Sequence, residues 1–314
     1  MITQKKDTSA FSFDELKGCI LITTPKEFSF SETLTYLTRS PLECLHHVED
    51  GKVTKLIEMG GNLVIIEISE QEDSLQVRFL DRKLGSKEAY EQVASYVNEW
   101  FDLQTDLSPF YQMAERDSML SGLTEDYHGL RIVGVPDLFE ALCWAVVGQQ
   151  VNLKFAYTLK KRVVESFGKH VEWNGRKYWL FPKPQDISTL TVEELKNLQF
   201  TGKKAEYIID IAKLMESGKL SKDSLLSCKD FKTAERWLLS IRGIGPWTAN
   251  YVLMRCLRNP AAFPIGDAGL QNALKLLLGR SQKPPLEEIQ QLFEPWKGWE
   301  AYAVFYLWRS LASN

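Results

Sequence analysis

Two kinds of hydrophobic pattern divide the chain. In the first third, short β-branched or alternating segments predict strands at residues 18–24, 52–59, 63–69 and 74–79. Asp50-Gly51 precedes the segment at 52–59, Gly60-Gly61-Asn62 separates it from the segment at 63–69, and both are typical of hairpin turns. Helical spacing predicts helices at 28–37, capped by Ser29 or Ser31, and at 86–101. We therefore expect an α+β layer over residues 1–107, an antiparallel sheet with helices on one face after a loosely held start at residues 1–13.

From about Asp106 onward the pattern becomes helical. Apolar positions recur with helical spacing over residues 137–151, 154–167, 191–198, 203–215, 230–241, 247–257, 269–278, 286–293 and 299–311. Residues 171–181 differ, because Asn174-Gly175 there favours a short hairpin or an aromatic loop. We expect residues 108–314 to form an all-α region.

Composition adds limits on the class of protein. The 314 residues are 44% hydrophobic and 25% charged, as in ordinary globular proteins. No stretch approaches the ~20 apolar residues of a membrane span, and the first residues lead into no apolar run, so we expect a cytoplasmic protein without a signal peptide. The five cysteines are scattered without C-x-x-C spacing, which argues against a disulfide framework and a zinc site.

Charge is distributed unevenly along the chain. The formal net charge is −3, but residues 1–107 hold 11 Lys and Arg against 19 Asp and Glu, a net −8. Residues 108–314 hold 27 against 22, a net +5. Because basic patches attract phosphate locally, the acidic total does not exclude a nucleic-acid partner for the helical region.

A glycine-punctuated turn joins two of the predicted helices. Gly243 and Gly245 can adopt φ > 0 and allow another backbone to approach closely, and Pro246 suits the first helical turn. The N–H groups at that helix start form a natural seat for phosphate, although an ordinary joint between helices has the same pattern. Asp267 follows after a Pro-broken loop. Taken alone, it is more often a turn residue or a helix cap than a catalytic group.

Together, the hairpin and Asp267 at this spacing resemble the helix-hairpin-helix DNA glycosylases, most closely the DNA-3-methyladenine glycosylase II branch. The resemblance implies two helical subdomains with an active-site cleft between them. It also implies that a damaged base is flipped out of double-stranded DNA and that Asp267 stabilises positive charge on the sugar or activates water. Strand-cutting relatives carry a nucleophilic lysine where this chain has Trp247. An indole cannot form a Schiff base, so we expect a monofunctional enzyme.

The same resemblance assigns DNA contacts. Phosphate would bind at Gly243, Ile244, Gly245, Thr248, Lys203 and Lys204. A monovalent cation could bind the backbone carbonyls of Ile241 and Ile244. Gln150 corresponds best to the wedge that fills the gap left by the flipped nucleotide, with Gln149 as the neighbouring alternative.

An aromatic pocket for the base is the remaining site. Trp247 and Tyr251 share one helix face, and with Tyr36 and Trp299 they would surround a cationic purine such as 3-methyladenine or 7-methylguanine. Such aromatics are also commonly core residues, which is the role we expect for Trp296, Trp308 and Tyr302. Ala268 replaces an aromatic found after the aspartate in some relatives, so the pocket is expected to be roomier.

The expected partner is damaged double-stranded DNA, bound by a monomer with no membrane association. No cofactor is required, and no iron–sulfur cluster is expected because no cysteine follows Cys256. Two alternatives remain open at this point: a glycosylase for oxidised or deaminated purines, and a non-catalytic helix-hairpin-helix protein. The second would have no need of an aspartate and aromatics in register.

Overall fold

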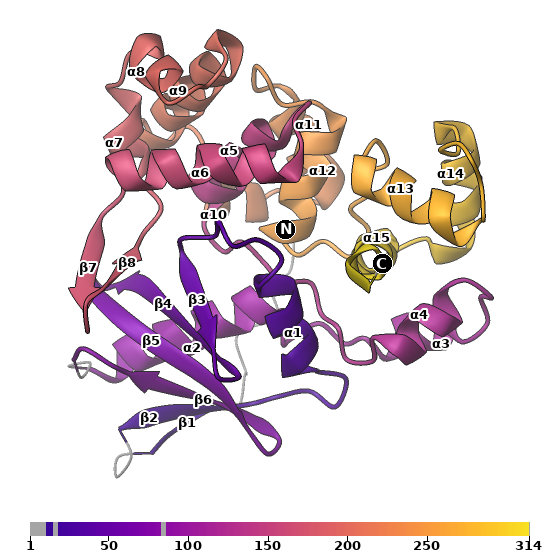
Figure 1. The fold of residues 1–314 in the computed structure, drawn as a ribbon, viewed down its shortest axis with the longest axis horizontal. Coiled ribbons are helices and arrows are strands. Elements are labelled where there is room, and N and C mark those ends of the chain that lie inside the picture. Colours follow the sequence, from indigo (N-terminus) through magenta and orange to yellow (C-terminus); the bar gives the residue numbers. More distant parts are fainter. Residues whose placement is uncertain (1–10, 15–17, 83–85, 314) are drawn as a thin grey trace.

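A β-sheet layer lies beside a larger helical body in the computed structural model, which describes residues 11–14, 18–82 and 86–313 (Figure 1). One cluster of buried hydrophobic side chains runs from the strands into the helices. The two parts therefore share a continuous core.

Six antiparallel strands form the sheet, in the order β1-β2-β6-β5-β4-β3. They span β1 Phe11–Asp14, β2 Cys19–Thr23, β3 His46–Glu49, β4 Lys52–Met59, β5 Asn62–Gln71 and β6 Ser74–Phe79. The four strands expected from the pattern are confirmed. The turn before β4 has φ of 49° at Asp50 and 70° at Gly51, as a two-residue hairpin turn requires. β1 and β3 were not predicted, and both are edge strands paired with one neighbour only.

Two helices belong to the sheet layer. α1 (Phe30–Leu37) is capped by Ser29, whose side chain accepts a hydrogen bond from the Glu32 N–H. α2 (Lys87–Phe101) is capped by Ser86 and packs on one face of the sheet, behind it in Figure 1. Both predicted helices and the Ser29 cap are confirmed. The start expected to be loose over residues 1–13 lies mostly outside the described residues, but Phe11–Phe13 belong to β1.

The helical body is built from many helices of moderate length. They are α3 Ser108–Ala114, α4 Leu120–Asp126, α5 Leu138–Gly148, α6 Leu153–Phe167, α7 Pro184–Ser188, α8 Val192–Asn197, α9 Gly202–Glu216, α10 Lys222–Leu226, α11 Phe231–Leu239, α12 Pro246–Arg255, α13 Ala268–Leu277, α14 Leu286–Phe293 and α15 Glu300–Ser310. All nine predicted helices are present within a few residues. The four that were missed, α3, α4, α7 and α10, have five to seven residues, too few for a clear period.

One hairpin interrupts the helical body, so residues 108–314 are mostly helical rather than all-α. β7 (His170–Trp173) and β8 (Arg176–Trp179) meet at Asn174-Gly175, as the sequence allowed. Tyr178 of β8 packs against Leu56 and Ile65 on the second face of the sheet. The hairpin thus holds the helical body against the sheet layer. The domain boundary at residue 107 stays a prediction.

None of the described helices combines the length and apolar character that a membrane crossing requires.

Candidate active site

Asp267 lies where three helices meet. It is the N-cap of α13, and its Oδ1 accepts a hydrogen bond of 2.8 Å from the Leu270 N–H. The indole of Trp247 on α12 donates from Nε1 to Oδ2 at 2.9 Å, and that of Trp308 on α15 donates to Oδ1 at 2.8 Å. The half-buried carboxylate is therefore held by three N–H donors, two of which are rigid side chains. Capping and a chemical role are compatible at this residue.

Gly269 makes this arrangement sterically possible. A Cβ at this position would lie 2.9 Å from Oδ1 of Asp267 and 3.2 Å from Nε1 of Trp308. The contact between indole and carboxylate would then have to open. Gly269 follows Asp267 by two residues in the sequence, but that spacing alone does not show why a glycine is needed there.

The aromatic set around the aspartate differs from the expected one. Trp247 and Tyr251 pack with ring centroids 5.6 Å apart, as their i, i+4 spacing predicts, and Tyr251 and Trp308 are 6.4 Å apart. Trp308, expected in the core, is half-buried beside Asp267. Trp299 instead packs on Phe110 at 5.8 Å, within another aromatic cluster. Trp308 therefore replaces Trp299 in the candidate pocket.

The expected core roles of two other aromatics are confirmed. Trp296 is 2% exposed and Tyr302 is 1% exposed.

A buried arginine fixes two tyrosines of the expected pocket. Arg255 at the end of α12 donates to the carbonyl of Val133 at 2.6 Å and to the hydroxyl of Tyr251 at 3.0 Å. A third hydrogen bond joins it to the hydroxyl of Tyr36. Burial raises the pKa of Tyr251 to about 12, so its hydroxyl stays neutral near pH 7. Tyr36 also lies under the guanidinium of Arg39, whose Cζ is 4.0 Å from the ring centroid, so that ring already has a cationic partner.

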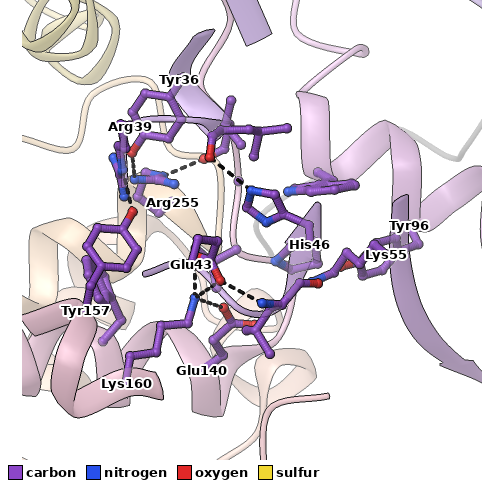
Figure 2. A pocket seen from close by; sticks show the side chains of 18 of the residues that line it. Tyr36, Arg39, Glu43, His46, Lys55, Tyr96, Glu140, Tyr157, Lys160 and Arg255 are labelled. Atoms are coloured by element: carbon purple, nitrogen blue, oxygen red, sulfur yellow. Dashed lines mark hydrogen bonds and ion pairs between the residues drawn. The ribbon is translucent and has the colours of Figure 1, made fainter. Parts of the chain in front are cut away.

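A small polar cavity lies next to these tyrosines, between the sheet layer and the helices (Figure 2). Lys160 lies there between Glu43 at 3.1 Å and Glu140 at 3.2 Å. Burial alone would raise the pKa of Glu43, but Lys160 outweighs it and holds that pKa well below its ordinary value. The volume of about 50 Å³ is far below the ~300–1,000 Å³ of ligand pockets, so this cavity is a polar contact between the two parts.

The turn between α11 and α12 has the positive φ that its glycines allow at Gly243 but not at Gly245. Gly243 has φ of 87°, and a Cβ there would lie 2.3 Å from the ring of Tyr207 on α9. Gly245, with φ of −94°, begins α12 and has no neighbour within 4 Å of a Cβ position. An open groove runs along this turn and is also lined by Gln149 and Gln150. Its free N–H groups at the start of α12 point to an anion site.

Other residues expected at DNA have structural partners. Thr248 is 2% exposed, and its hydroxyl accepts a hydrogen bond from Gln149. Lys204 is 8% exposed and donates to two backbone carbonyls. Both side chains are thus engaged within the protein, and phosphate binding at these two residues stays a prediction. Lys203 is exposed and free to reach a phosphate, and Gln150 is exposed as a wedge requires, whereas Gln149 is tied to the turn.

The cation expected at the carbonyls of Ile241 and Ile244 stays a prediction. The carbonyl of Ile241 accepts a hydrogen bond of 3.0 Å from the Ile244 N–H. Across the described ranges, no three His, Cys, Asp or Glu side chains gather into a group suited to a metal ion.

Comparison with known proteins agrees with this geometry. Residues 143–298 match the HhH-GPD superfamily of base excision DNA repair proteins. The chain belongs to this superfamily. The helix-hairpin-helix turn and Asp267 both lie within the matched range. Residues 20–142 match the N-terminal domain of 8-oxoguanine DNA glycosylase, which accounts for the sheet layer of this HhH-GPD protein.

Individual relatives cover nearly the whole chain. A DNA-3-methyladenine glycosylase of Bacillus subtilis is 48% identical over 96% of this chain and 99% of its own. The solved 3-methyladenine DNA glycosylase of Archaeoglobus fulgidus has a TM-score of 0.79 at 25% identity, covering 92% of this chain and 97% of its own. The 8-oxoguanine glycosylase/lyase of Clostridium acetobutylicum with double-stranded DNA shares the fold, with a TM-score of 0.74 at 18% identity over 98% of each chain.

Proposed function

We propose that the protein is a monofunctional DNA-3-methyladenine glycosylase of base-excision repair, which hydrolyses the N-glycosidic bond of an alkylated purine in double-stranded DNA. The observation that supports this proposal most directly is the carboxylate of Asp267, which the indoles of Trp247 and Trp308 hold in place by hydrogen bonds. The 48% identity to the Bacillus subtilis glycosylase over nearly its full length supports the same activity.

The reaction places positive charge on the sugar. The bond between C1′ and the base nitrogen breaks, and its electron pair leaves with the base, which N-alkylation has already made electron-poor. The fixed carboxylate of Asp267 stabilises the resulting oxocarbenium-like sugar more than the ground state, as a transition-state interaction must. Water then adds to C1′, and Asp267 is placed to orient it or accept its proton. The reaction consumes only water and requires no cofactor.

Trp247 decides the branch of the mechanism. It occupies the position of the lysine nucleophile in strand-cutting relatives, and its Nε1 bonds Asp267. Because an indole offers no amine for a Schiff base, the product is an intact abasic site. Borohydride added during turnover should trap no protein–DNA adduct, and strand breaks should appear only after alkali. A trapped adduct would contradict the assignment.

The base would stack on the aromatic faces near the aspartate. Trp247 and Trp308, both half-buried, offer rings to a cationic purine, an interaction worth ~0.5–2 kcal/mol, and Tyr251 packs beside both of them. Tyr36 contributes shape more than cation binding, since Arg39 already lies over its ring. Few hydrogen-bonding groups are required, so we expect broad selectivity among alkylated bases.

DNA would bind along the open groove at the hairpin. Gly243, Ile244 and Gly245 line it, and Lys203 adds an exposed ammonium group. Because the Ile244 N–H already bonds the Ile241 carbonyl, the N–H groups of the two glycines are the ones that would bind phosphate. Arg242 pairs with Glu206 and Asp210, so the backbone carries more of this contact than the arginine. The Clostridium acetobutylicum relative was solved with double-stranded DNA, which agrees with this partner.

Asp267→Asn tests the proposal. Asparagine caps helices about as well as aspartate, so α13 should stay folded, while the negative charge and the hydrogen bond from the Trp247 indole are lost. Release of 7-methylguanine and 3-methyladenine from methylated duplex should fall ~10²–10³-fold or more, with DNA affinity retained. Asp230→Asn is the matched control, since Asp230 caps α11 in the same way and its variant should keep full activity. Equal release by Asp267→Asn and wild type would remove Asp267 from the mechanism.

A panel of duplexes tests the substrate class. Hypoxanthine and 8-oxoguanine represent the deaminated and oxidised purines. We expect faster release of the methylated bases, because their glycosidic bonds are already weakened. Faster release of 8-oxoguanine would instead assign the protein to oxidised bases.

A further inference from the structure

Lys204 is a buried lysine without an acidic partner. It lies in the first turn of α9 and is 8% exposed. The nearby carboxylates of α9, on Glu206 and Asp210, pair with Arg242 instead. Burial lowers the pKa of Lys204 below its ordinary value, and no acidic neighbour offsets that effect. A buried ammonium group is costly unless its protons are bonded, so its partners identify its role.

Those partners are carbonyls at the end of α5. The Nζ of Lys204 is 2.7 Å from the carbonyl oxygen of Val147 and 2.7 Å from that of Gln149. The last carbonyls of a helix lack partners within the helix and carry partial negative charge. Lys204 therefore completes the C-terminal end of α5 from a neighbouring helix.

A second set of contacts holds the segment at the end of α5. We call residues 148–151 the wedge loop. The side chain of Gln149 donates to the Gly243 carbonyl and to the Thr248 hydroxyl, both at 3.0 Å. Gln150 comes next, exposed and with φ of 54°, in the left-handed region that few side chains adopt.

The wedge loop also touches the candidate active site. A Cβ at Gly148 would lie 3.5 Å from the Trp247 ring, which bonds Asp267. Movement of this loop would therefore disturb both the groove and the base pocket.

We propose that Lys204 is a positioning residue for base flipping, which fixes the wedge loop so that Gln150 enters the gap left by the extruded nucleotide. This role rests on the proposed function, because only an enzyme that extrudes a base needs a wedge. Without Lys204, the loop must be ordered at each encounter with DNA. Removing Lys204 should therefore slow extrusion of the base from a paired duplex. It should not slow cleavage of the glycosidic bond once the base is in the pocket.

Two duplexes separate these steps. One carries 7-methylguanine opposite cytosine, and the other carries it opposite a tetrahydrofuran abasic analogue, where no pairing holds the base in the stack. Under single-turnover conditions, Lys204→Met should slow release from the paired duplex about 10-fold or more, as expected for a lost charge-assisted hydrogen bond. Release from the unpaired duplex should change about 3-fold or less, because only stacking, without base pairing, then opposes extrusion of the base. Lys204→Arg, which keeps the donors and the charge, should restore most of the rate.

Controls make the result specific. Lys213→Met removes an exposed lysine of the same helix and should leave both rates unchanged. Gln150→Ala should show the same dependence on pairing, and adding Lys204→Met to it should slow release little further, because both changes act on one step. If Lys204→Met folds poorly, Lys204→Gln keeps one donor and should show a smaller defect of the same kind.

The outcomes are distinguishable. Equal slowing on both duplexes, or additive effects of the two substitutions, would show a merely structural lysine and overturn the proposal. An unchanged rate would do the same. A wild-type protein that releases no methylated base from either duplex would overturn the proposed function itself, and this role with it.

Discussion

Replacing Gly243 by alanine should destabilise the hairpin, whereas the same change at Gly245 should weaken DNA binding and leave the hairpin stable. Two independent penalties meet at Gly243. Its φ of 87° lies in the left-handed region, and its Cβ would lie 2.3–2.7 Å from three ring carbons of Tyr207. Gly245, two residues on, has φ of −94° and open space around the Cβ position, so it is a matched control.

The magnitude follows from these two terms. A left-handed conformation costs a non-glycine residue ~1–2 kcal/mol. Forcing a methyl group into a packed site adds ~1–3 kcal/mol as the ring of Tyr207 is displaced. Gly243→Ala should therefore lower the free energy of unfolding by about 2–5 kcal/mol. Gly245→Ala should change it by less than about 1 kcal/mol, since the entropic gain and the weaker cap nearly cancel.

Urea unfolding followed by tryptophan fluorescence measures the difference. The double variant Gly243→Ala with Tyr207→Ala, compared with Tyr207→Ala alone, should show only the backbone part of the penalty. Gly245→Ala should stay stable yet bind duplex DNA more weakly, because its methyl group enters the groove where phosphate would approach. Equal midpoints for the two alanine variants, or a full penalty in the Tyr207→Ala background, would refute this reasoning.

Three further predictions concern the buried charges. Arg255→Met should lower the free energy of unfolding by about 2–4 kcal/mol and slow base release, because Tyr36, Tyr251 and the Val133 carbonyl all lose their shared donor. Lys160→Met should lower the free energy of unfolding by about 3–5 kcal/mol, because Glu43 and Glu140 lose the buried cation that pairs with both of them. Burial lowers the pKa of His46 from 6.5 to about 4, so its contribution to stability should be complete above pH 6.5 and fall as the pH drops toward 4.

Each of these predictions has an internal control. Lys161→Met removes a neighbouring lysine whose side chain is 41% exposed, against 10% for Lys160, and it should cost less than about 0.5 kcal/mol. A loss equal to that of Lys160→Met would show that burial does not matter. His46→Gln should flatten the decline of the urea midpoint between pH 6.5 and 4, whereas exposed His170→Gln should not. For Arg255→Met, unchanged stability would show that the tyrosine hydroxyls find other partners.

The predictable part of the fold was local. The Asp50-Gly51 and Asn174-Gly175 turns act through their own backbone conformation, and Ser29 caps a residue three positions on, so the elements next to them were found from the pattern. Strands β1 and β3 were missed because an edge strand of four residues carries little periodicity of its own. Its pairing is decided by the neighbouring strand.

The candidate site divides in the same way. Asp267 and the pair of Trp247 and Tyr251 follow from helix spacing and a family resemblance. The sequence predicts Trp308 in the core and Trp299 in the pocket. The spacing of aromatic residues along a helix does not show which of them face the core and which face a pocket. Lys204 is expected from the sequence to bind phosphate together with Lys203, and only the tertiary structure shows that it is buried and caps another helix.

The sequence by itself thus determined the order of elements, the hairpin with its left-handed glycine and the carboxylate at the start of α13. These depend on interactions between residues close in the chain. The tertiary structure decided which indoles hold that carboxylate, which lysine supports the wedge loop and where the two parts are joined by buried charge. These contacts join segments that are far apart in the chain, 117 residues in the case of Lys160 and Glu43. The spacing of residues in the sequence therefore does not predict them.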